Sequence, residues 1–232
     1  MIVKRGNNKP KTNPIQLQHI EIEEASTYKY LGYNFNNKDN LSTHIEEQKK
    51  KVEAAYQKIL AIIGNPNFTC IEMECVWTLL NTCVVPIITY AGETCHPNIQ
   101  EKKKINQLLD NILKRILMVP QSTPREVIYL EVGMLDPLHR INMNKMMLYN
   151  RLHTNQNSLN CNLIQEEHET KWKIETEKVM NEYHIDKNEI KTASKLKAKA
   201  IIKKQVKEKM LEDLKKNGEH IPMRILALLF YF

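Results

Sequence analysis

The chain has 232 residues, of which 42% are hydrophobic and 26% charged, a composition typical of a folded globular protein and not of a disordered segment. Its formal net charge of +7 at pH 7 suits an anionic partner such as nucleic acid, although charge also serves solubility and can reflect genome base composition. Only 6 Gly, 4 Phe and 2 Trp are present, which favours helices over a β-sandwich or barrel.

The positive charge is segmented along the chain. Residues 1–64 carry 10 basic and 7 acidic side chains, residues 97–151 carry 9 and 5, and residues 187–216 carry 11 and 4. Such spacing suits contacts with a phosphate backbone in several places. The same stretches can equally be solvated faces of a soluble protein.

Cysteine usage and the two ends of the chain bear on location. The five cysteines are odd in number and form no CxxC pair, which is typical of a reducing compartment. The apolar run at Met1 is short and turns basic at once, unlike a signal peptide, and the closing run 225–232 is too short to span a bilayer. We expect an intracellular protein, cytoplasmic or nuclear, that is not secreted and has no membrane partner.

The chain opens with short predicted strands. Apolar residues alternate over residues 15–22, with one phase shift, and again over 28–35, and Asn13-Pro14 is a turn former between strands. These stretches predict a small antiparallel sheet. Because so few short strands are marginal in water, we expect this region to be the edge of a larger domain.

From Ser42 the apolar period becomes 3.6 residues, which predicts an amphipathic helix with Ser42 as its N-cap and Gly64 as its end. A second helix is predicted from a capping box at Thr69 to Tyr90. Since it is apolar nearly all round, it should be the central buried helix, kinked near Pro86.

Further helices are predicted downstream. One covers about 98–118 before Pro120, a short one begins at Thr123-Pro124 and is closed by Gly133, and one begins with Asp136 as N-cap and Pro137 at its first position. Asn-rich residues 154–165 indicate a linker. A mixed-charge helix over about 166–183 and a Lys-rich helix over 187–216 follow.

These elements predict an α+β fold that is mainly α, with a small N-terminal β-hairpin region, a helical bundle and a basic helical extension. The divisions expected are N-terminal strands over 1–40, a helical domain over 41–155, a linker and mixed-charge helix over 156–186, a basic helix over 187–216 and a tail over 217–232.

No catalytic constellation is recognisable. The chain has no Gly-rich phosphate loop, no HExxH, no GxSxG and no paired aspartates of the two-metal type. Its eight histidines show no metal-ligand spacing. We predict no catalytic residue and no metal site, and we expect four histidines to be surface or capping residues: His44, His96, His139 and His153.

Five segments carry the most information. They are YKYLGYNF at 28–35 with LSTHI at 41–45 and three lysines at 49–51, PIITYAGE at 86–93, RIL at 115–117 before Pro120, Thr123-Pro124, and EVGMLDP at 131–137. In this order and spacing they resemble the end of the palm and the thumb of reverse transcriptases of non-LTR (LINE-type) retrotransposons, in which the YKYLG hairpin is the primer grip. The resemblance covers residues 1–155 and extends over 156–216 only in general character.

The resemblance implies a fragment of a retrotransposon RNA-directed DNA polymerase. Tyr30, Leu31 and Gly32 would form the primer grip, and Lys49, Lys50 and Lys51 would contact the backbone of the template–primer duplex. The aspartates that hold Mg²⁺ in such polymerases would lie upstream, so the chain is expected not to be an enzyme on its own and to need no cofactor. The implied partners are an RNA–DNA or DNA duplex, bound weakly and without sequence preference, and the fingers and palm of the parent polymerase.

The same residues can be interpreted without the resemblance. Gly32 suits a close approach of two backbones, and the resemblance implies that the second is the primer strand. Tyr30 and Tyr33 are expected on opposite faces of a strand, with Leu31 and Phe35 as sheet core. The lysines at 49–51 span almost a full helical turn, so at most two can face one groove.

Two alternatives stay open. The chain can be a non-enzymatic basic helical protein, derived from a retroelement, that binds nucleic acid or another protein, or it can be an inert relic. In the first case four lysines of the Lys-rich helix would act as an independent basic arm: Lys203, Lys204, Lys207 and Lys209. Trp172, between two lysines, is expected to anchor helix packing, with stacking on a base as the other option.

Overall fold

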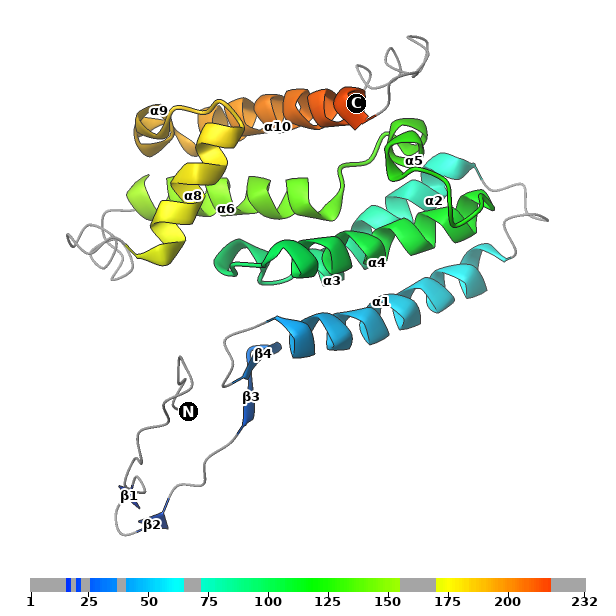
Figure 1. Ribbon diagram of the computed structural model, residues 1–232, viewed down its shortest axis with the longest axis horizontal. Helices are drawn as coiled ribbons and strands as arrows, with labels where there is room; N and C mark the ends of the chain where they lie inside the picture. The colour runs from blue at the N-terminus through cyan, green and yellow to red at the C-terminus, as the bar shows by residue number, and fades with distance from the viewer. Residues whose placement is uncertain are drawn as a thin grey trace.

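The computed structural model describes residues 16–17, 20–21, 26–36, 41–64, 72–154 and 170–217. Two small hairpins precede a body of helices (Figure 1), which confirms the predicted α+β, mainly α fold class. Strand β1 (Gln16–Leu17) pairs with β2 (Ile20–Glu21), and β3 (Thr27–Tyr30) pairs with β4 (Tyr33–Asn36), both antiparallel. The two pairs form separate sheets, so the prediction of a single small sheet for these residues is wrong.

Helix α1 (Ser42–Ile63) follows the hairpin and ends at Gly64, as predicted. Its N-cap is Leu41 and not Ser42. The Leu41 N–H donates to Glu101 Oε1 at 2.8 Å, so a carboxylate from another helix satisfies a backbone group at this end. The buried face of α1 has the predicted helical spacing, with Ile45, Val52, Tyr56, Ile59 and Ile63.

The second predicted helix consists of three consecutive segments, a π-helical one between two α-helical ones. These are α2 (Met73–Leu79), the π-helical η1 (Leu80–Val84) and α3 (Val85–Thr89). Pro86 cannot donate to the helix ladder and its ring crowds the carbonyl four residues earlier, and the wide π turn just before it relieves that clash. The predicted kink near Pro86 takes this form, while the capping box at Thr69 lies outside the described residues.

This second segment is buried on one side only, so the prediction of a helix buried nearly all round is wrong. Val76, Leu80, Val84, Val85 and Ile88 are buried, whereas Met73, Cys75, Cys83 and Pro86 are exposed. By length and composition, the stretch Met73–Thr94 suffices to cross a membrane. A core helix passes the same test, and its buried side here packs against α1.

Three helices follow in close agreement with the sequence. Helix α4 (Ile99–Leu117) begins with a capping box in which Asn98 Oδ1 accepts from the Glu101 N–H at 3.0 Å and Glu101 Oε2 accepts from the Asn98 N–H at 2.8 Å. Helix α5 (Arg125–Val132) ends at Gly133 with φ of 67°, and α6 (Pro137–Thr154) begins with Asp136 Oδ1 accepting from the His139 N–H at 2.8 Å. The 3₁₀ turn η2 (Gly92–Thr94) connects α3 to the start of α4.

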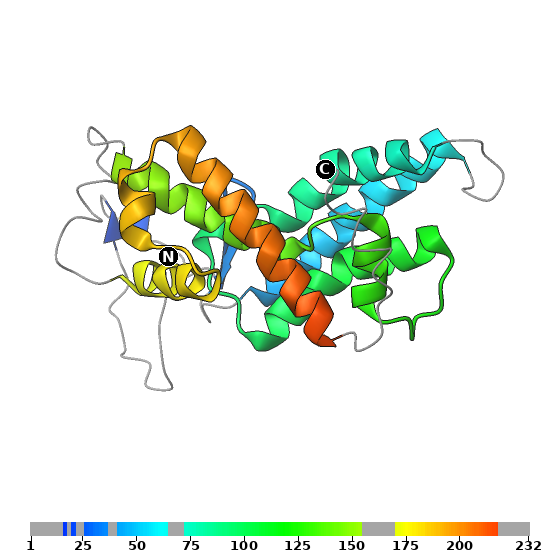
Figure 2. The ribbon, with the colours of Figure 1, turned by 90° about the horizontal axis from the view of Figure 1, so that it is seen from above.

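The Lys-rich region forms two helices, α9 (Lys187–Thr192) and α10 (Lys195–Asn217), after α8 (Lys171–Glu182). The prediction of one continuous helix over 187–216 is therefore wrong. The break is held by buried Asn150 of α6, whose amide donates to Ile190 O at 2.7 Å and to Ala193 O at 2.9 Å. Helix α10 lies across α6 (Figures 1 and 2) and buries Ile202 and Val206.

The buried residues form two clusters that meet at α6. The first joins α1, α2, α3, α4 and α5, and includes Ile141 of α6 and Met210 of α10. The second joins α8, α9 and α10 to Met146 and Tyr149, one to two turns further along α6. Helix α6 therefore connects the two parts of the helical body.

Candidate nucleic-acid interface

The β3–β4 hairpin presents a tight turn next to α1. Leu31 and Gly32 have φ of 47° and 82°, and Tyr30 pairs with Tyr33 across them. A two-residue turn with positive φ at both positions matches the twist of the flanking strands. The Tyr90 hydroxyl donates to the Leu31 carbonyl and so holds the strained residue.

The role of Gly32 is conformational. At φ of 82° an L side chain is strained. An added Cβ would lie 3.5 Å from the Tyr90 ring, which is an ordinary contact. The turn itself accounts for the glycine, so a close approach of the primer backbone is not required to explain it.

One face of the hairpin carries aromatic side chains. Tyr30 and Tyr33 are cross-strand partners, and so are Tyr28 and Phe35, and partners in a ladder share a face. The prediction that Tyr30 and Tyr33 point to opposite faces is wrong, because the turn places them on different strands. Tyr28, Tyr30 and Phe35 are 53%, 57% and 41% exposed.

Leu31 is 74% exposed at the tip of the hairpin. The expectation that Leu31 and Phe35 form sheet core is therefore wrong. The physical reason is that the hairpin has two strands only, and among the described residues the helical body packs against Tyr33 but leaves Tyr28, Tyr30, Leu31 and Phe35 exposed.

The opposite face of the hairpin is tied to α1 by polar contacts. Lys29 Nζ lies 2.6 Å from Glu47 Oε1, and the Asn34 amide also donates to Glu47. The Asn36 amide donates to Thr43 Oγ1 at 3.1 Å. Hydrogen bonds from Lys29 and then Asn34 lower the pKa of Glu47 to about 2. No local pattern marks Glu47 as part of the site, because its partners are up to 18 residues away in the chain.

Lys49, Lys50 and Lys51 lie on α1 and are all exposed. Lys51 Nζ is 3.6 Å from Glu47 Oε1, so part of its charge is compensated. Lys50 and Lys51 lie 100° apart around the axis of α1, on the side away from the core. Lys58 lies about two turns further along the helix, and its direction around the axis falls between those of Lys50 and Lys51. Lys58 is exposed and was missed by sequence reasoning, although its i+7 and i+8 spacing was the available signal.

The α10 lysines lie at the other edge of the helical body. In Figure 1, α10 and α1 occupy opposite sides of the helices. Lys204 is 3.9 Å from Glu208 and Lys209 is 3.2 Å from Asp213. Helix α10 itself packs on α6.

Other residues of the five segments support the fold. Arg115 forms two hydrogen bonds with Glu53, at 3.0 and 2.7 Å, and its guanidinium lies 4.3 Å from the centre of the Tyr56 ring. A Cβ on Gly92 would lie 2.7 Å from Ile141 Cγ1, so only glycine lets η2 pack on α6.

A buried polar network joins α4, α5 and α6. The Tyr129 hydroxyl donates to Asp110 at 2.8 Å, and Arg125 lies 3.4 Å from Asp110 and 3.2 Å from Asp136. Burial raises the pKa of Asp110, although Arg125 and Tyr129 act to lower it. Burial also opposes ionisation of Asp136, but hydrogen bonds with His139 and the charges of His139 and Arg125 lower its pKa.

Two of the four selected histidines are not surface residues. His44 is buried and its ring lies 4.4 Å from that of Tyr33, and burial lowers its pKa. His139 lies between Asp136, at 2.9 Å, and Asp213 of α10, at 3.7 Å. In the part of the chain that the structure describes, no group of three or more His, Cys, Asp or Glu side chains is placed to hold a metal ion.

Comparison of the chain with protein-family models, curated proteins and solved structures gives no match.

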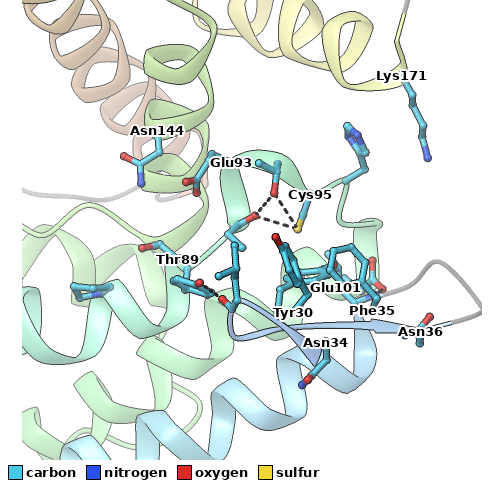
Figure 3. A pocket seen from close by; sticks show the side chains of 18 residues that line it. Tyr30, Asn34, Phe35, Asn36, Thr89, Glu93, Cys95, Glu101, Asn144 and Lys171 are labelled. Atoms are coloured by element: carbon cyan, nitrogen blue, oxygen red, sulfur yellow. Dashed lines mark hydrogen bonds between the residues drawn. The ribbon is translucent and has the colours of Figure 1, made fainter. Parts of the chain in front are cut away.

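A cavity of about 780 Å³ opens beside the hairpin (Figure 3). It lies between β3–β4, the segment from Pro86 to His96 and Lys171 at the start of α8. The rings that line it come from Tyr30, Tyr33, Phe35 and Tyr90. Leu31, Leu41, Pro86 and Ala91 add apolar surface, and the other lining residues are Asn34, Asn36, Thr89, Glu93, Thr94, Cys95, His96, Glu101, Asn144 and Lys171.

Several of these polar groups already have partners. The Glu101 carboxylate accepts from two backbone N–H groups, and Cys95 Sγ donates to the Ala91 carbonyl at 3.1 Å. Burial raises the pKa of the Cys95 thiol, which makes it a poor nucleophile. Glu101 and Cys95 are therefore engaged in contacts within the fold.

Proposed function

We propose that the chain is the primer-grip and thumb portion of a non-LTR retrotransposon reverse transcriptase, which binds an RNA–DNA or DNA duplex weakly and without sequence preference. One observation supports this most: an exposed hairpin tip, Tyr30 to Gly32, is tied through Glu47 to the helix that carries Lys50, Lys51 and Lys58. A fixed tip beside a row of lysines can follow a phosphate backbone, and such contacts position a duplex without reading its sequence.

The proposal includes no catalysis by this chain alone. Phosphoryl transfer in polymerases requires two metal ions held by carboxylates, and no such pair is recognisable in the sequence. We expect no primer extension from the purified chain with Mg²⁺, deoxynucleotides and a primed RNA template. Extension above that of a heat-inactivated sample would contradict this part of the proposal.

The interface is tested by measuring how the affinity for a blunt RNA–DNA duplex depends on salt concentration. Fluorescence anisotropy measures the binding. Replacement of Lys49, Lys50 and Lys51 by Gln should reduce the slope of log affinity against log salt by about 0.9 for each lost phosphate contact, hence by roughly 0.9 to 1.8. At most two of the three lysines share a groove-facing side, which sets the upper value.

The matched control neutralises lysines on α10. Replacement of Lys203, Lys204, Lys207 and Lys209 by Gln removes more charge but should change the slope by less than the α1 variant does. If the α10 variant abolishes binding while the α1 variant binds like the wild type, the second candidate function holds, a basic helical binding protein. Duplex affinity that is independent of salt, or absent at low salt, would refute both.

A further inference from the structure

The cavity beside the hairpin is not needed for contacts between lysines and a duplex backbone. Its aromatic wall is formed by rings that the fold leaves exposed, since Tyr30 and Phe35 are 57% and 41% accessible. An exposed cluster of apolar rings in a folded protein indicates a binding surface. A volume of about 780 Å³ is within the range of pockets that hold small organic groups.

The chemistry of the wall restricts the occupant. Rings on one side favour a flat group that stacks, and the polar side chains around them favour a group with hydrogen-bonding edges. Glu93, Thr94 and Asn144 lie on the part of the wall formed by η2 and α6, and Figure 3 shows Glu93 and Asn144 on the same side of the cavity. A purely apolar protein segment would offer no hydrogen-bonding group to Glu93 and Asn144, whereas a nucleobase combines a flat face with polar edges.

Positive charge lies at the edge of the same cavity. Lys171, the first residue of α8, is exposed, and no carboxylate of the described residues forms an ion pair with it. Figure 3 places Lys171 at one end of the cavity, away from the hairpin residues Tyr30 and Asn34. A lysine here can neutralise the phosphate that follows a base seated between them.

We propose that this cavity binds an unpaired nucleobase of a strand that leaves the duplex at the hairpin tip, with stacking on Phe35 and Tyr30. Tyr30 and Leu31 belong to both the tip and the cavity wall, so a strand held at the tip has its next base beside the opening. The inference rests on the proposed function for the position of the duplex. The cavity's affinity for a base does not depend on that function.

The experiment uses the full chain and three stem-loop duplexes with one free end. One end is blunt, one carries a two-nucleotide thymidine overhang, and one carries the same overhang with abasic sugars in place of the bases. The overhang with bases should bind about 5- to 100-fold more tightly than the blunt duplex, because stacking of a base on an aromatic side chain has this magnitude. The abasic overhang should bind like the blunt duplex, apart from a small contribution of its phosphates.

Two variants separate the cavity from the rest of the aromatic face. Phe35→Leu keeps apolar bulk but removes a stacking ring from the cavity, and it should remove most of the gain from the overhang. Tyr28→Leu is the matched control, because Tyr28 is the cross-strand partner of Phe35 and similarly exposed but does not line the cavity. The Tyr28→Leu variant should still bind the overhang duplex more tightly than the blunt duplex. Thermal melts by circular dichroism check that both variants fold like the wild type.

The outcomes distinguish this inference from the proposed function. Equal binding of the abasic and base-bearing overhangs would overturn the inference, and so would equal effects of Phe35→Leu and Tyr28→Leu. If no duplex binds, a short oligothymidylate and its abasic counterpart replace the stem-loops. Base-dependent and Phe35-dependent binding of that single strand would support the cavity while refuting the proposed duplex interface, and its absence would refute both.

Discussion

At the scale of single residues, the buried carboxylate Asp110 depends on few donors. Its side chain is mostly enclosed and accepts from the Tyr129 hydroxyl at 2.8 Å, with Arg125 at 3.4 Å. Tyr129→Phe leaves this carboxylate with one donor fewer and should lower the free energy of unfolding by about 1–3 kcal/mol, measured by urea denaturation. Tyr149→Phe is the control, because the partner of that hydroxyl, Glu177, also contacts Lys187 at 2.9 Å and is partly exposed. Tyr149→Phe should lower the free energy of unfolding by less than Tyr129→Phe does. Equal decreases would show that Asp110 does not depend on the Tyr129 hydroxyl.

Glu47 is the residue whose titration reports on the hairpin. Its pKa is lowered from 4.5 to about 2, mainly by Lys29 and then by Asn34. A depressed carboxyl pKa means that the stabilising contribution is present above the unfolded value and is lost as the pH falls through the folded value. Carbon NMR of the Glu47 carboxyl should therefore show a midpoint near 2, and Lys29→Gln should move it upward. A midpoint near 4.5 in the wild-type chain would show that Glu47 does not hold the hairpin.

At the scale of elements, the break between α9 and α10 depends on Asn150. Its amide satisfies two carbonyls, at 2.7 and 2.9 Å, that a continuous helix would satisfy through its own N–H groups. Asn150→Ala leaves both buried acceptors without this donor and should cost roughly 2 kcal/mol or more, measured by thermal and urea unfolding. Asn142→Ala, on the same helix, removes a single bond of 3.1 Å to the Tyr183 hydroxyl and should cost less. A neutral Asn150→Ala would show that α9 and α10 are held by packing alone.

At the scale of the whole molecule, α6 joins the two buried clusters, so the helical body should unfold in one transition. Trp77 packs against the first cluster and Trp172 against the second, and each can be observed alone after replacing the other by Phe. Ile202→Ala, in the second cluster, should cost about 2–5 kcal/mol. It should lower the urea midpoints seen by both tryptophans to the same extent. Midpoints that separate would show two independently unfolding parts.

Most of the helices could be predicted from the sequence because the signals that define a helix lie within or next to it. Period, N-caps and closing glycines lie within a few residues of the element that they define. Gly64, Gly133 and Asp136 act at the predicted positions. The fold class, α+β and mainly α, follows from the same information.

What only the tertiary structure decided are the features that depend on groups far apart in the chain. Glu101 accepts from the N–H of Leu41 at the start of α1 across 60 residues, Asn150 breaks the Lys-rich helix across about 40, and Tyr90 holds the turn at Leu31 across 59. The helical body packs against Tyr33 but leaves Tyr28, Tyr30 and Phe35 of the aromatic face exposed, and the cavity exists because η2 and α8 lie beside that face. Periodicity shows which residues share a face, whereas what covers that face is set by packing between distant segments.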